Sequence, residues 1–521
     1  MAAGEIAVGG DGSTVGLSGR DRFWRALKFC RDGPWPLGLL VLFAAVAYGA
    51  YALDRHWHFG SGAYDLGLFD QAIWHYSRFE APVSTLYLAG PTNVLSDHFS
   101  PILVTLAPFY WVWDNVDVLL IAQAALFASA AVPIWMFVRR RLGVVPAYCF
   151  ASAYLAYWGI LQAVAFDFHE IAFAVPLIAF AILFADQERW RSFFSCVVLL
   201  LLVKEDLALL IAFLGIYLIL KRHRRQGATC VLLGILAFYV TTKLLMPHFA
   251  VVGSAIPRGS PQNWTYTRLG KNQLDSLRNI IVHPTLLPRV FLHPVVKEHT
   301  ELAILRPFAF LAMFSPLTIV AIPLLAERFL SSTTSYWVQM YHYTATVSPV
   351  VAMSSADGLA NLLRWTRSSG QRWRRLALAG GALVLALNVV TLPSSPLGNL
   401  THASFYQQSA TDAAGNAALA HVPPRVSVVT ENAIAPHLTH RDVVTLLTRV
   451  SRDQMYIVTN IHASPRPGFA KRTDIQRYLA IQEADGYAII FSRRGWTVLA
   501  KAPRSSSKHR VKRGVDVRSR G

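Results

Sequence analysis

The sequence predicts a polytopic α-helical membrane protein, with about 11 transmembrane helices, that ends in a small C-terminal extracytoplasmic α/β domain. Of the 521 residues, 54% are hydrophobic and 15% are charged, whereas soluble proteins carry about 25% charged residues. Apolar runs close to the ~20 residues that cross a bilayer recur up to residue 393, and short β-rich runs follow. With 29 Phe and 14 Trp, this apolar content also excludes an intrinsically disordered chain.

Most candidate spans are continuous apolar runs, at residues 37–53, 116–138, 144–166, 171–185, 228–246, 343–363 and 376–392. The run 192–220 carries Lys204, Glu205 and Asp206 at its centre. One continuous helix would bury three charges, each at a cost of about 2.5–3.5 kcal/mol. We therefore expect a hairpin with these charges at the outer surface. The run 304–330 is broken at Ser315-Pro316 and predicts two short helices.

Basic residues cluster between the spans, at residues 20–31, 139–141, 221–225 and 364–375. Short loops rich in Lys and Arg face the cytoplasm, which predicts an integral plasma-membrane protein with a cytoplasmic N-terminus. Residues 1–35 then form a basic cytoplasmic segment, and residues 36–393 form the membrane domain. Each cluster borders an apolar run and lacks interleaved aromatic residues, so we do not expect nucleic acid as a partner.

Two large outer loops are expected, at residues 54–115 and 247–301. The basic clusters at residues 20–31 and 139–141 are both expected to be cytoplasmic, so an even number of spans lies between them. The runs 37–53 and 116–138 supply these two spans. The apolar piece 99–113 is therefore expected to form a helix that lies in the outer interface without crossing the membrane. Residues 394–500 alternate β-rich and helical runs, which predicts a small extracytoplasmic α/β domain. The expected strands are 425–430, 442–447, 455–459, 487–492 and 496–500, and the expected helices are 412–421 and 474–484. Residues 501–521 are expected to form a basic disordered tail.

Five segments that are distant in sequence place ionisable or aromatic groups at the same predicted outer face. Ionisable groups that border apolar segments are costly and mark functional sites. Asp65 and Asp70 are the candidate catalytic residues. The candidate substrate-binding residues are Asp97, His98, Asp167, His169, Glu170, Lys204, Glu205, Asp206, Tyr341 and His342.

Each of these residues also has an ordinary structural explanation. Asp97 or Asp167 alone is typical of a helix cap, and a lone His beside aromatic residues is typical of an interface or a hydrogen-bonded core. Taken together, the set suits two kinds of chemistry. A carboxylate can accept a proton from an acceptor hydroxyl or amine while Lys204 neutralises a phosphate leaving group. Alternatively, the Asp, Glu and His side chains match the ligands of a divalent metal such as Mg²⁺ or Mn²⁺, without a diagnostic spacing.

The order of the polar motifs resembles that of a bacterial membrane family designated domain of unknown function 2079. The motifs are Tyr64-Asp-Leu-Gly-Leu-Phe-Asp-Gln71, Asp97-His-Phe-Ser-Pro101, Phe168-His-Glu170, Val203-Lys-Glu-Asp206 and Tyr341-His-Tyr343. Residues 431–437 and 486–492 resemble the outer domain of that family. The resemblance covers roughly residues 37–500.

That family is similar in layout to the GT-C glycosyltransferases, which include protein mannosyltransferases and aminoarabinose transferases. The resemblance implies a polyprenyl-phosphate sugar donor among the membrane lipids, a catalytic Asp at Asp65 with Asp70 as the second candidate, and Lys204 near the donor phosphate. The sequence lacks an Asp-Glu pair after Tyr64, and His98-Phe-Ser-Pro101 stands in place of a Lys/His-Pro-Pro motif. A transporter and a non-catalytic scaffold or sensor stay open as alternatives, and the oligomeric state is not predicted.

Overall fold

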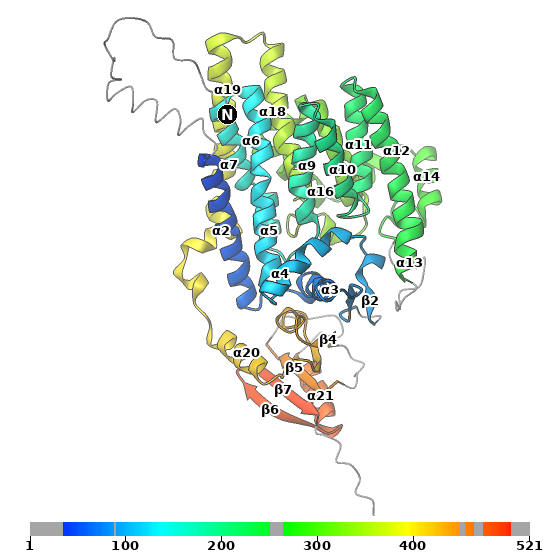
Figure 1. The fold of residues 1–521 in the computed structure, drawn as a ribbon, viewed down its shortest axis with the longest axis vertical. Coiled ribbons are helices and arrows are strands. Elements are labelled where there is room, and N and C mark those ends of the chain that lie inside the picture. The colour runs from blue at the N-terminus through cyan, green and yellow to red at the C-terminus, as the bar shows by residue number, and fades with distance from the viewer. Residues whose placement is uncertain (1–34, 88–89, 251–263, 448–453, 463–471, 502–521) are drawn as a thin grey trace, which may run out of the picture.

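The computed structural model describes residues 35–87, 90–250, 264–447, 454–462 and 472–501. The predicted cytoplasmic segment before Trp35 and the predicted tail after Lys501 lie outside the described residues. Figure 1 shows a helical bundle with a β-sheet at one end. The ends of α6, α18 and α19 lie at the opposite end of the bundle (Figure 1).

Within the described residues, four helical segments are long and apolar enough to cross a membrane, and a bent pair of helices counts as a fifth if it forms one span. The pair, α7 (Val144–Leu155) and α8 (Trp158–Val164), bends by 42° within the run expected to form one span. The four segments are Trp35–Trp57, Asp117–Leu142, Arg224–Ala250 and Gly370–Ser394. They contain α2 (Trp35–Trp57), α5 (Asp117–Ser129), α6 (Ala131–Leu142), α12 (Arg224–Val240), α13 (Met246–Ala250) and α19 (Gly370–Val389).

Shorter helices complete the bundle, namely α9 (Ile171–Asp186), α10 (Trp190–Leu201), α11 (Leu207–Leu220) and α18 (Val347–Trp365). Helices α10 and α11 are the two arms of the expected hairpin, and Lys204 lies in the turn between them. The number of about eleven crossings stays a prediction, because several of these helices are shorter than a span.

The expectation of two short helices in the run 304–330 is wrong for its first half. After the last two residues of α16 (Val295–Leu305), that half forms separate 3₁₀ turns, and α-helix resumes at α17 (Ile322–Leu330). Ala309 and Phe310 adopt left-handed backbone angles, with φ of 51° and 57°, which interrupt a right-handed helix. Pro307 and Pro316 each lack the backbone N–H that an α-helix needs in its interior.

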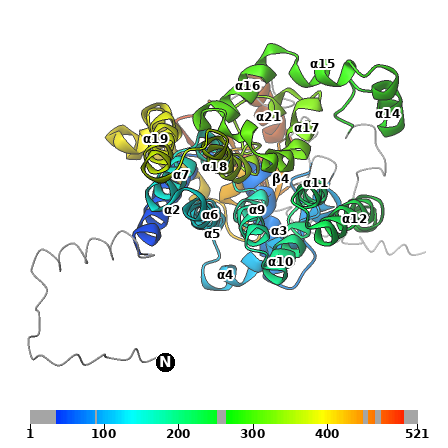
Figure 2. The same cartoon turned by 90° about the horizontal axis from the view of Figure 1, so that it is seen from above.

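The segment 54–115, which is the predicted first outer loop, contains two short helices, α3 (Leu68–Tyr76) and α4 (Ala107–Val112), with a 3₁₀ helix at Pro101–Leu106. The expected interfacial helix 99–113 is therefore a continuous apolar helical segment, Pro101–Val112, which begins as the 3₁₀ helix and continues as α4. Strands β1 (Val83–Ser84) and β2 (Thr92–Asn93) pair antiparallel within the same loop. The second outer loop contains α14 (Gln273–Val282), α15 (Leu286–Leu292) and α16 (Val295–Leu305). Figure 2 shows α14 and α15 at the side of the bundle.

The C-terminal region forms a mixed five-stranded sheet in the order β4-β3-β5-β7-β6. Strand β3 is parallel to β4 and β5, whereas β7 is antiparallel to β5 and β6. The strands are β3 (Ser427–Thr430), β4 (Val443–Leu446), β5 (Tyr456–Asn460), β6 (Tyr487–Arg493) and β7 (Trp496–Lys501), and the helices are α20 (Ala410–Ala420) and α21 (Arg472–Ala484). These bounds lie within two residues of the expected ones, because alternating apolar residues and turn residues mark short strands clearly.

One hydrophobic core joins this sheet to the first outer loop. It contains Leu66 and Phe69 of the loop together with Val428, Val458 and Val498 of the sheet. A separate core on the other side of the sheet packs under α21. The sheet is therefore anchored directly against the segment that carries Asp65.

Candidate functional site

Asp65 lies on a single π-helical turn, Ala63–Gly67. Isolated π turns occur frequently at functional sites. Asp167 holds the start of this turn, because its Oδ2 accepts a hydrogen bond from the backbone N–H of Gly62 at 2.7 Å. The other oxygen of Asp167 accepts from the Arg55 guanidinium at 2.8 Å. Asp167 therefore positions the turn that carries Asp65.

Asn432 of the C-terminal domain holds the same turn from the other side. Its Oδ1 accepts a hydrogen bond from the backbone N–H of Ala63 at 2.9 Å. A Cβ atom at Gly62 would lie 3.1 Å from the Asn432 amide nitrogen and 3.2 Å from an oxygen of Asp167. A side chain at this position would require Asn432 or Asp167 to shift by a few tenths of an ångström.

His169 faces Asp65. The imidazole Nε2 lies 3.2 Å from Asp65 Oδ1, and the backbone N–H of His169 donates to Gln123 Oε1 at 3.0 Å. The ring meets His342 edge-on, with 3.5 Å between ring centroids. Two turns that are far apart in sequence, 167–170 and 341–343, therefore meet beside Asp65.

Burial sets the protonation states of these groups. It raises the pKa of Asp65 to about 7, and the negative charges of Asp167 and Glu170 act in the same direction. Burial lowers the pKa of His169 and of His342 well below the ordinary value, and the positive charge of Lys204 adds to this effect. Near neutral pH both imidazoles are therefore neutral, and Asp65 can gain or lose a proton.

Lys204 lies in the turn between α10 and α11, with its ammonium between two carboxylates. Its Nζ is 3.6 Å from Glu170 Oε1 and 3.6 Å from Asp206 Oδ2. Burial lowers the pKa of Lys204, but Asp206 and Glu170 outweigh that effect and raise it well above its ordinary value. Lys204 therefore stays positively charged.

Glu205 links this turn to the first outer loop. Its Oε1 lies 3.2 Å from His98 Nδ1, and its Oε2 accepts from the backbone N–H of Phe99 at 3.0 Å. Asp97 accepts a hydrogen bond from the Tyr87 hydroxyl at 3.1 Å. Asp97 and His98 therefore border the site, and the structure shows no contact between either of them and Asp65 within the described residues.

Several buried polar atoms of this cluster have no hydrogen-bond partner within the part of the chain that the structure describes. They are both ring nitrogens of His169, Glu170 Oε2, Asp206 Oδ1 and His342 Nδ1. Native proteins pair the large majority of buried polar atoms. Such atoms gathered around one point indicate a site that a ligand completes.

A cavity of about 60 Å³ lies beside the cluster. Its polar lining contains two basic and two acidic side chains, together with His342. The lining residues are Ile171, Lys204, Asp206, Leu207, Leu324, Glu327, Arg328, Tyr336, His342, Tyr343 and Thr346. The cavity is therefore a polar pocket lined by both acidic and basic side chains.

Sequence reasoning missed Glu327 and Arg328, both on α17. The buried guanidinium of Arg328 donates to Thr344 Oγ1 and to the carbonyl of Val338, each at 2.7 Å. These bonds hold the segment that carries His342. A charged pair inside the apolar run 304–330 is itself a signal of a functional site, so both residues could have been found from the sequence.

Tyr341 supports His342 rather than lining the cavity. Its backbone has a φ of 70°, which is uncommon for a residue with a side chain. Its ring packs edge-on against Phe166, with 5.0 Å between centroids. Phe166 in turn packs against the rings of His169 and His342.

Asp70 occupies a different environment from Asp65. It is fully buried on α3 and accepts a hydrogen bond from the Tyr110 hydroxyl at 2.6 Å. Burial raises the pKa of Asp70 to about 7, whereas hydrogen bonds from Thr439 and Tyr110 act to lower it. None of these partners belongs to the cluster around His169 and Lys204, so the geometry separates the two candidate catalytic residues.

The divalent metal that the sequence allowed finds no ready-made site in the described residues. No three His, Cys, Asp or Glu side chains among them converge on a point where they could hold a metal ion. The side chains as placed form ion pairs and close contacts with one another instead.

Comparison with solved structures finds two forms of one protein with a TM-score above 0.5 and a third structure with a lower score. The structure of ArnT from Cupriavidus metallidurans bound to undecaprenyl phosphate is similar at a TM-score of 0.54 and 13% identity, over 91% of this chain and 100% of that chain. The apo structure of the same protein gives a TM-score of 0.51 at 12% identity, with the same coverage. The apo oligosaccharyltransferase of Archaeoglobus fulgidus gives a TM-score of 0.36 at 12% identity, over 82% of this chain and 70% of that chain.

The chain is therefore similar in fold to the two ArnT structures. No curated protein matches the sequence. The model of one family, described as predicted membrane proteins (DUF2079), matches residues 55–493. Because this match covers most of the sequence, the chain belongs to the DUF2079 family of predicted membrane proteins.

Proposed function

We propose that this protein is a membrane glycosyltransferase that moves a sugar from a polyprenyl-phosphate donor to an acceptor at the outer membrane face. The observation that carries the proposal is the contact of Asp65 with His169, next to the Lys204 ammonium and an incompletely paired polar cavity. The fold adds support, because the similar ArnT structure holds undecaprenyl phosphate.

The proposed reaction is a single inverting displacement. The acceptor hydroxyl or amine attacks the anomeric carbon of the donor sugar, and a bond from that oxygen or nitrogen to the carbon forms. Asp65 takes the acceptor proton as general base. The bond from the anomeric carbon to the phosphate oxygen breaks, and the polyprenyl phosphate leaves with the electron pair.

Asp65 suits this role because its pKa, raised by burial to about 7, lies near neutral pH, where a general base is most effective. His169, with its lowered pKa, adds no positive charge beside it. An uncharged imidazole leaves Asp65 free to accept the proton.

Lys204 suits the departing phosphate because it stays charged within the site. Its distances of 3.6 Å to Glu170 and to Asp206 are long for direct hydrogen bonds. The ammonium is therefore held by charge rather than by tight bonds, and it can turn toward a phosphate oxygen. Charge stabilisation of this kind is commonly the largest contribution to such catalysis.

The orientation follows from the basic clusters. Residues 139–141 and 364–375 lie at the end of the bundle opposite the sheet (Figure 1), and such clusters face the cytoplasm. Asp65 and the C-terminal sheet then lie on the extracytoplasmic side of the plasma membrane.

The proposal is tested with a matched pair of substitutions, Asp65→Asn and Asp70→Asn. Each variant is expressed in source cells that lack the chromosomal copy, and polyprenyl-phosphate sugars are measured in lipid extracts by mass spectrometry. We expect Asp65→Asn to accumulate the donor to the level of the deletion strain, and Asp70→Asn to keep it near the wild-type level. Equal membrane amounts of both variants, shown by immunoblot, separate loss of chemistry from loss of protein.

The alternative functions predict different results. A transporter would move a substrate into proteoliposomes, and a scaffold would leave lipid-linked sugars unchanged in every strain. Wild-type donor levels in the Asp65→Asn strain contradict the proposed reaction.

A further inference from the structure

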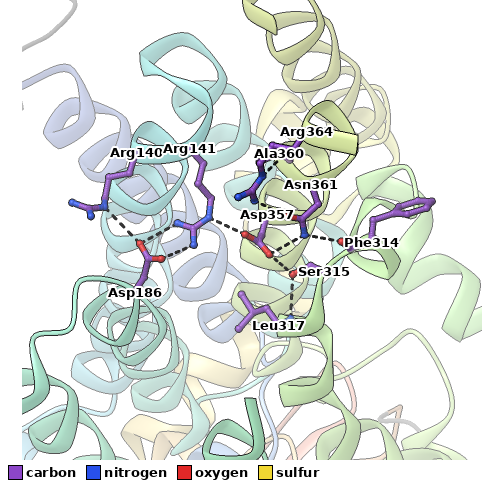
Figure 3. A network of polar contacts seen from close by, with 10 residues as sticks. All are labelled: Arg140, Arg141, Asp186, Phe314, Ser315, Leu317, Asp357, Ala360, Asn361 and Arg364. Carbon is purple, nitrogen blue, oxygen red and sulfur yellow. Dashed lines mark hydrogen bonds and ion pairs between the residues drawn. The ribbon is translucent and has the colours of Figure 1, made fainter. Parts of the chain in front are cut away.

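A second cluster of charged residues lies at the opposite end of the bundle, among the ends of five helices. Arg140 and Arg141 end α6, Asp186 ends α9, and Lys221 follows α11. Asp357 and Arg364 lie on α18, and Trp373 lies on α19. Figure 3 shows the α6, α9 and α18 side chains converging.

The centre of this cluster is a completed ion-pair network. The Arg141 guanidinium donates to both oxygens of Asp186, at 2.6 and 3.1 Å, and to Asp357 Oδ1 at 3.0 Å. The second oxygen of Asp357 accepts from Ser315 Oγ at 2.7 Å. Both carboxylates are therefore satisfied largely by one arginine (Figure 3).

The remaining cations have no carboxylate of their own. Arg364 donates to the Asn361 side chain and to the carbonyl of Ala360, both of which are neutral. Arg140 has one long contact of 3.6 Å with Asp186, and 55% of its side chain is exposed. Lys221 forms no ion pair within the described residues; its nearest described partner is the Tyr217 ring.

These cations surround an open cavity of about 640 Å³. Its volume is typical of small-molecule sites. The lining carries four positive and two negative side chains and one tryptophan, namely Arg140, Arg141, Lys221 and Arg364, Asp186 and Asp357, and Trp373, together with Ala360. The cavity therefore has an excess of positive charge.

We propose that this cavity binds a phosphate group, which is a site separate from the candidate catalytic site. Guanidinium groups bind phosphate through paired hydrogen bonds, and the two carboxylates are already occupied by Arg141. The carboxyl ends of helices also meet here and carry partial negative charge. That charge is partial and falls off within the last helical turn, whereas the guanidinium and ammonium groups carry full charges into the cavity.

Two ligands carry such a phosphate group, namely an anionic phospholipid in its headgroup and a free phosphate ion. The positive-inside rule places the cavity at the cytoplasmic surface, where anionic lipids concentrate. Trp373 in the lining is typical of the level of lipid headgroups.

The experiment measures binding of two probes to the purified full chain in a zwitterionic detergent. One probe is phosphatidylglycerol, detected by native mass spectrometry, and the other is inorganic phosphate, detected by the shift in Tm. The test variant is Lys221→Gln with Arg364→Gln, and the matched control is Arg372→Gln with Arg375→Gln. The control removes the same charge from exposed positions of α19 that do not line the cavity.

We expect at least one probe to bind the wild type, and the test variant to lose affinity by at least about tenfold, as the loss of charge-assisted hydrogen bonds predicts. The control should keep the wild-type affinity. A response to phosphatidylglycerol alone identifies a lipid headgroup, and a response to both probes identifies the phosphate group itself. The inference is overturned if neither probe binds, or if both double variants lose affinity equally. Both substituted positions in the test variant are exposed, so misfolding is not expected, and an unchanged Tm without ligand verifies this.

Discussion

The two charged clusters, one at each end of the helical bundle, differ in how completely their polar atoms are paired. Around Arg141 each carboxylate accepts good hydrogen bonds, and the network joins α6, α9 and α18. Around Asp65 and Lys204 the contacts are longer, and buried atoms of His169, Glu170 and His342 have no hydrogen-bond partner in the described part of the chain.

Similar residue types therefore serve different purposes in the two clusters. A paired buried network stabilises a fold or is neutral to it, and breaking it is costly. A buried polar cluster without full hydrogen bonding lowers the stability of the free protein. Such a cluster is retained where a ligand or a transition state supplies the missing hydrogen bonds. We therefore expect substitutions at the Asp65 end to change function, and substitutions within the paired network of Arg141, Asp186 and Asp357 to change stability.

Asp65→Asn should give the largest functional effect. Loss of a general base lowers the rate by about 10²–10⁴-fold, so sugar transfer should fall by at least about 100-fold. The Tm should not fall, because asparagine keeps the shape of the side chain and removes a raised-pKa carboxyl. If the variant loses both sugar transfer and Tm, Asp65 has a structural role instead of a catalytic one.

Asp357→Ala should give the opposite pattern. It leaves the buried Arg141 guanidinium without one of its carboxylates, which costs about 3–5 kcal/mol for a buried pair. We expect a clear fall in Tm in detergent, with the specific activity of the folded fraction unchanged. Arg140→Gln is the control, because this exposed residue should contribute about 0–1 kcal/mol. Similar losses of Tm in both variants would show that the buried pair of Arg141 and Asp357 stabilises the protein no more than the exposed Arg140 does.

The pH dependence of transfer should follow the carboxyl of Asp65. The base is active when deprotonated and its pKa is raised to about 7, so the rate should fall about tenfold per pH unit below 7 and level off above it. Asp70, whose pKa is also raised to about 7, is controlled for by Asp70→Asn, which should keep the same midpoint. A midpoint near 4 in rate measurements would show that an ordinary exposed carboxylate acts instead.

Asn432→Ala should give the smallest effect. It removes the hydrogen bond from the backbone of Ala63, worth about 0.5–1.5 kcal/mol, which corresponds to a loss of transfer of roughly 2- to 13-fold. Asn460→Ala is the matched control, because it removes a hydrogen bond within the same domain, to His462, away from the turn that carries Asp65. Equal losses of sugar transfer in the two variants would show that any weakening of the C-terminal domain lowers the rate, and that Asn432 does not act by positioning Asp65.

The sequence predicted the elements well where a local pattern defines them. Apolar runs marked α2, α9 and α19, and the charges at Lys204 marked the turn between α10 and α11. The same charge pattern pointed to the turns that the structure brings together around His169. The irregular stretch before α17 was not predicted, because the left-handed residues Ala309 and Phe310 carry no composition signal.

The sequence pointed to several residues that the structure brings together around His169, but it did not indicate the residues that support them. Arg55 and Asn432 hold the turn of Asp65 through contacts that span 112 and 369 positions in sequence. Such pairings depend on tertiary packing, which a local pattern does not encode. Asp70 is the reverse case, since its short distance in sequence from Asp65 suggested a shared site, whereas α3 directs it toward Tyr110.

Binding of undecaprenyl phosphate to the purified full chain tests the central claim most directly. Native mass spectrometry compares the wild type with Lys204→Gln, and with Lys271→Gln as an exposed lysine outside both cavities. We predict that the wild type and Lys271→Gln bind the lipid equally, and that Lys204→Gln loses affinity by at least about tenfold. Equal binding by all three proteins would contradict the assignment of this end of the molecule to a lipid-linked donor.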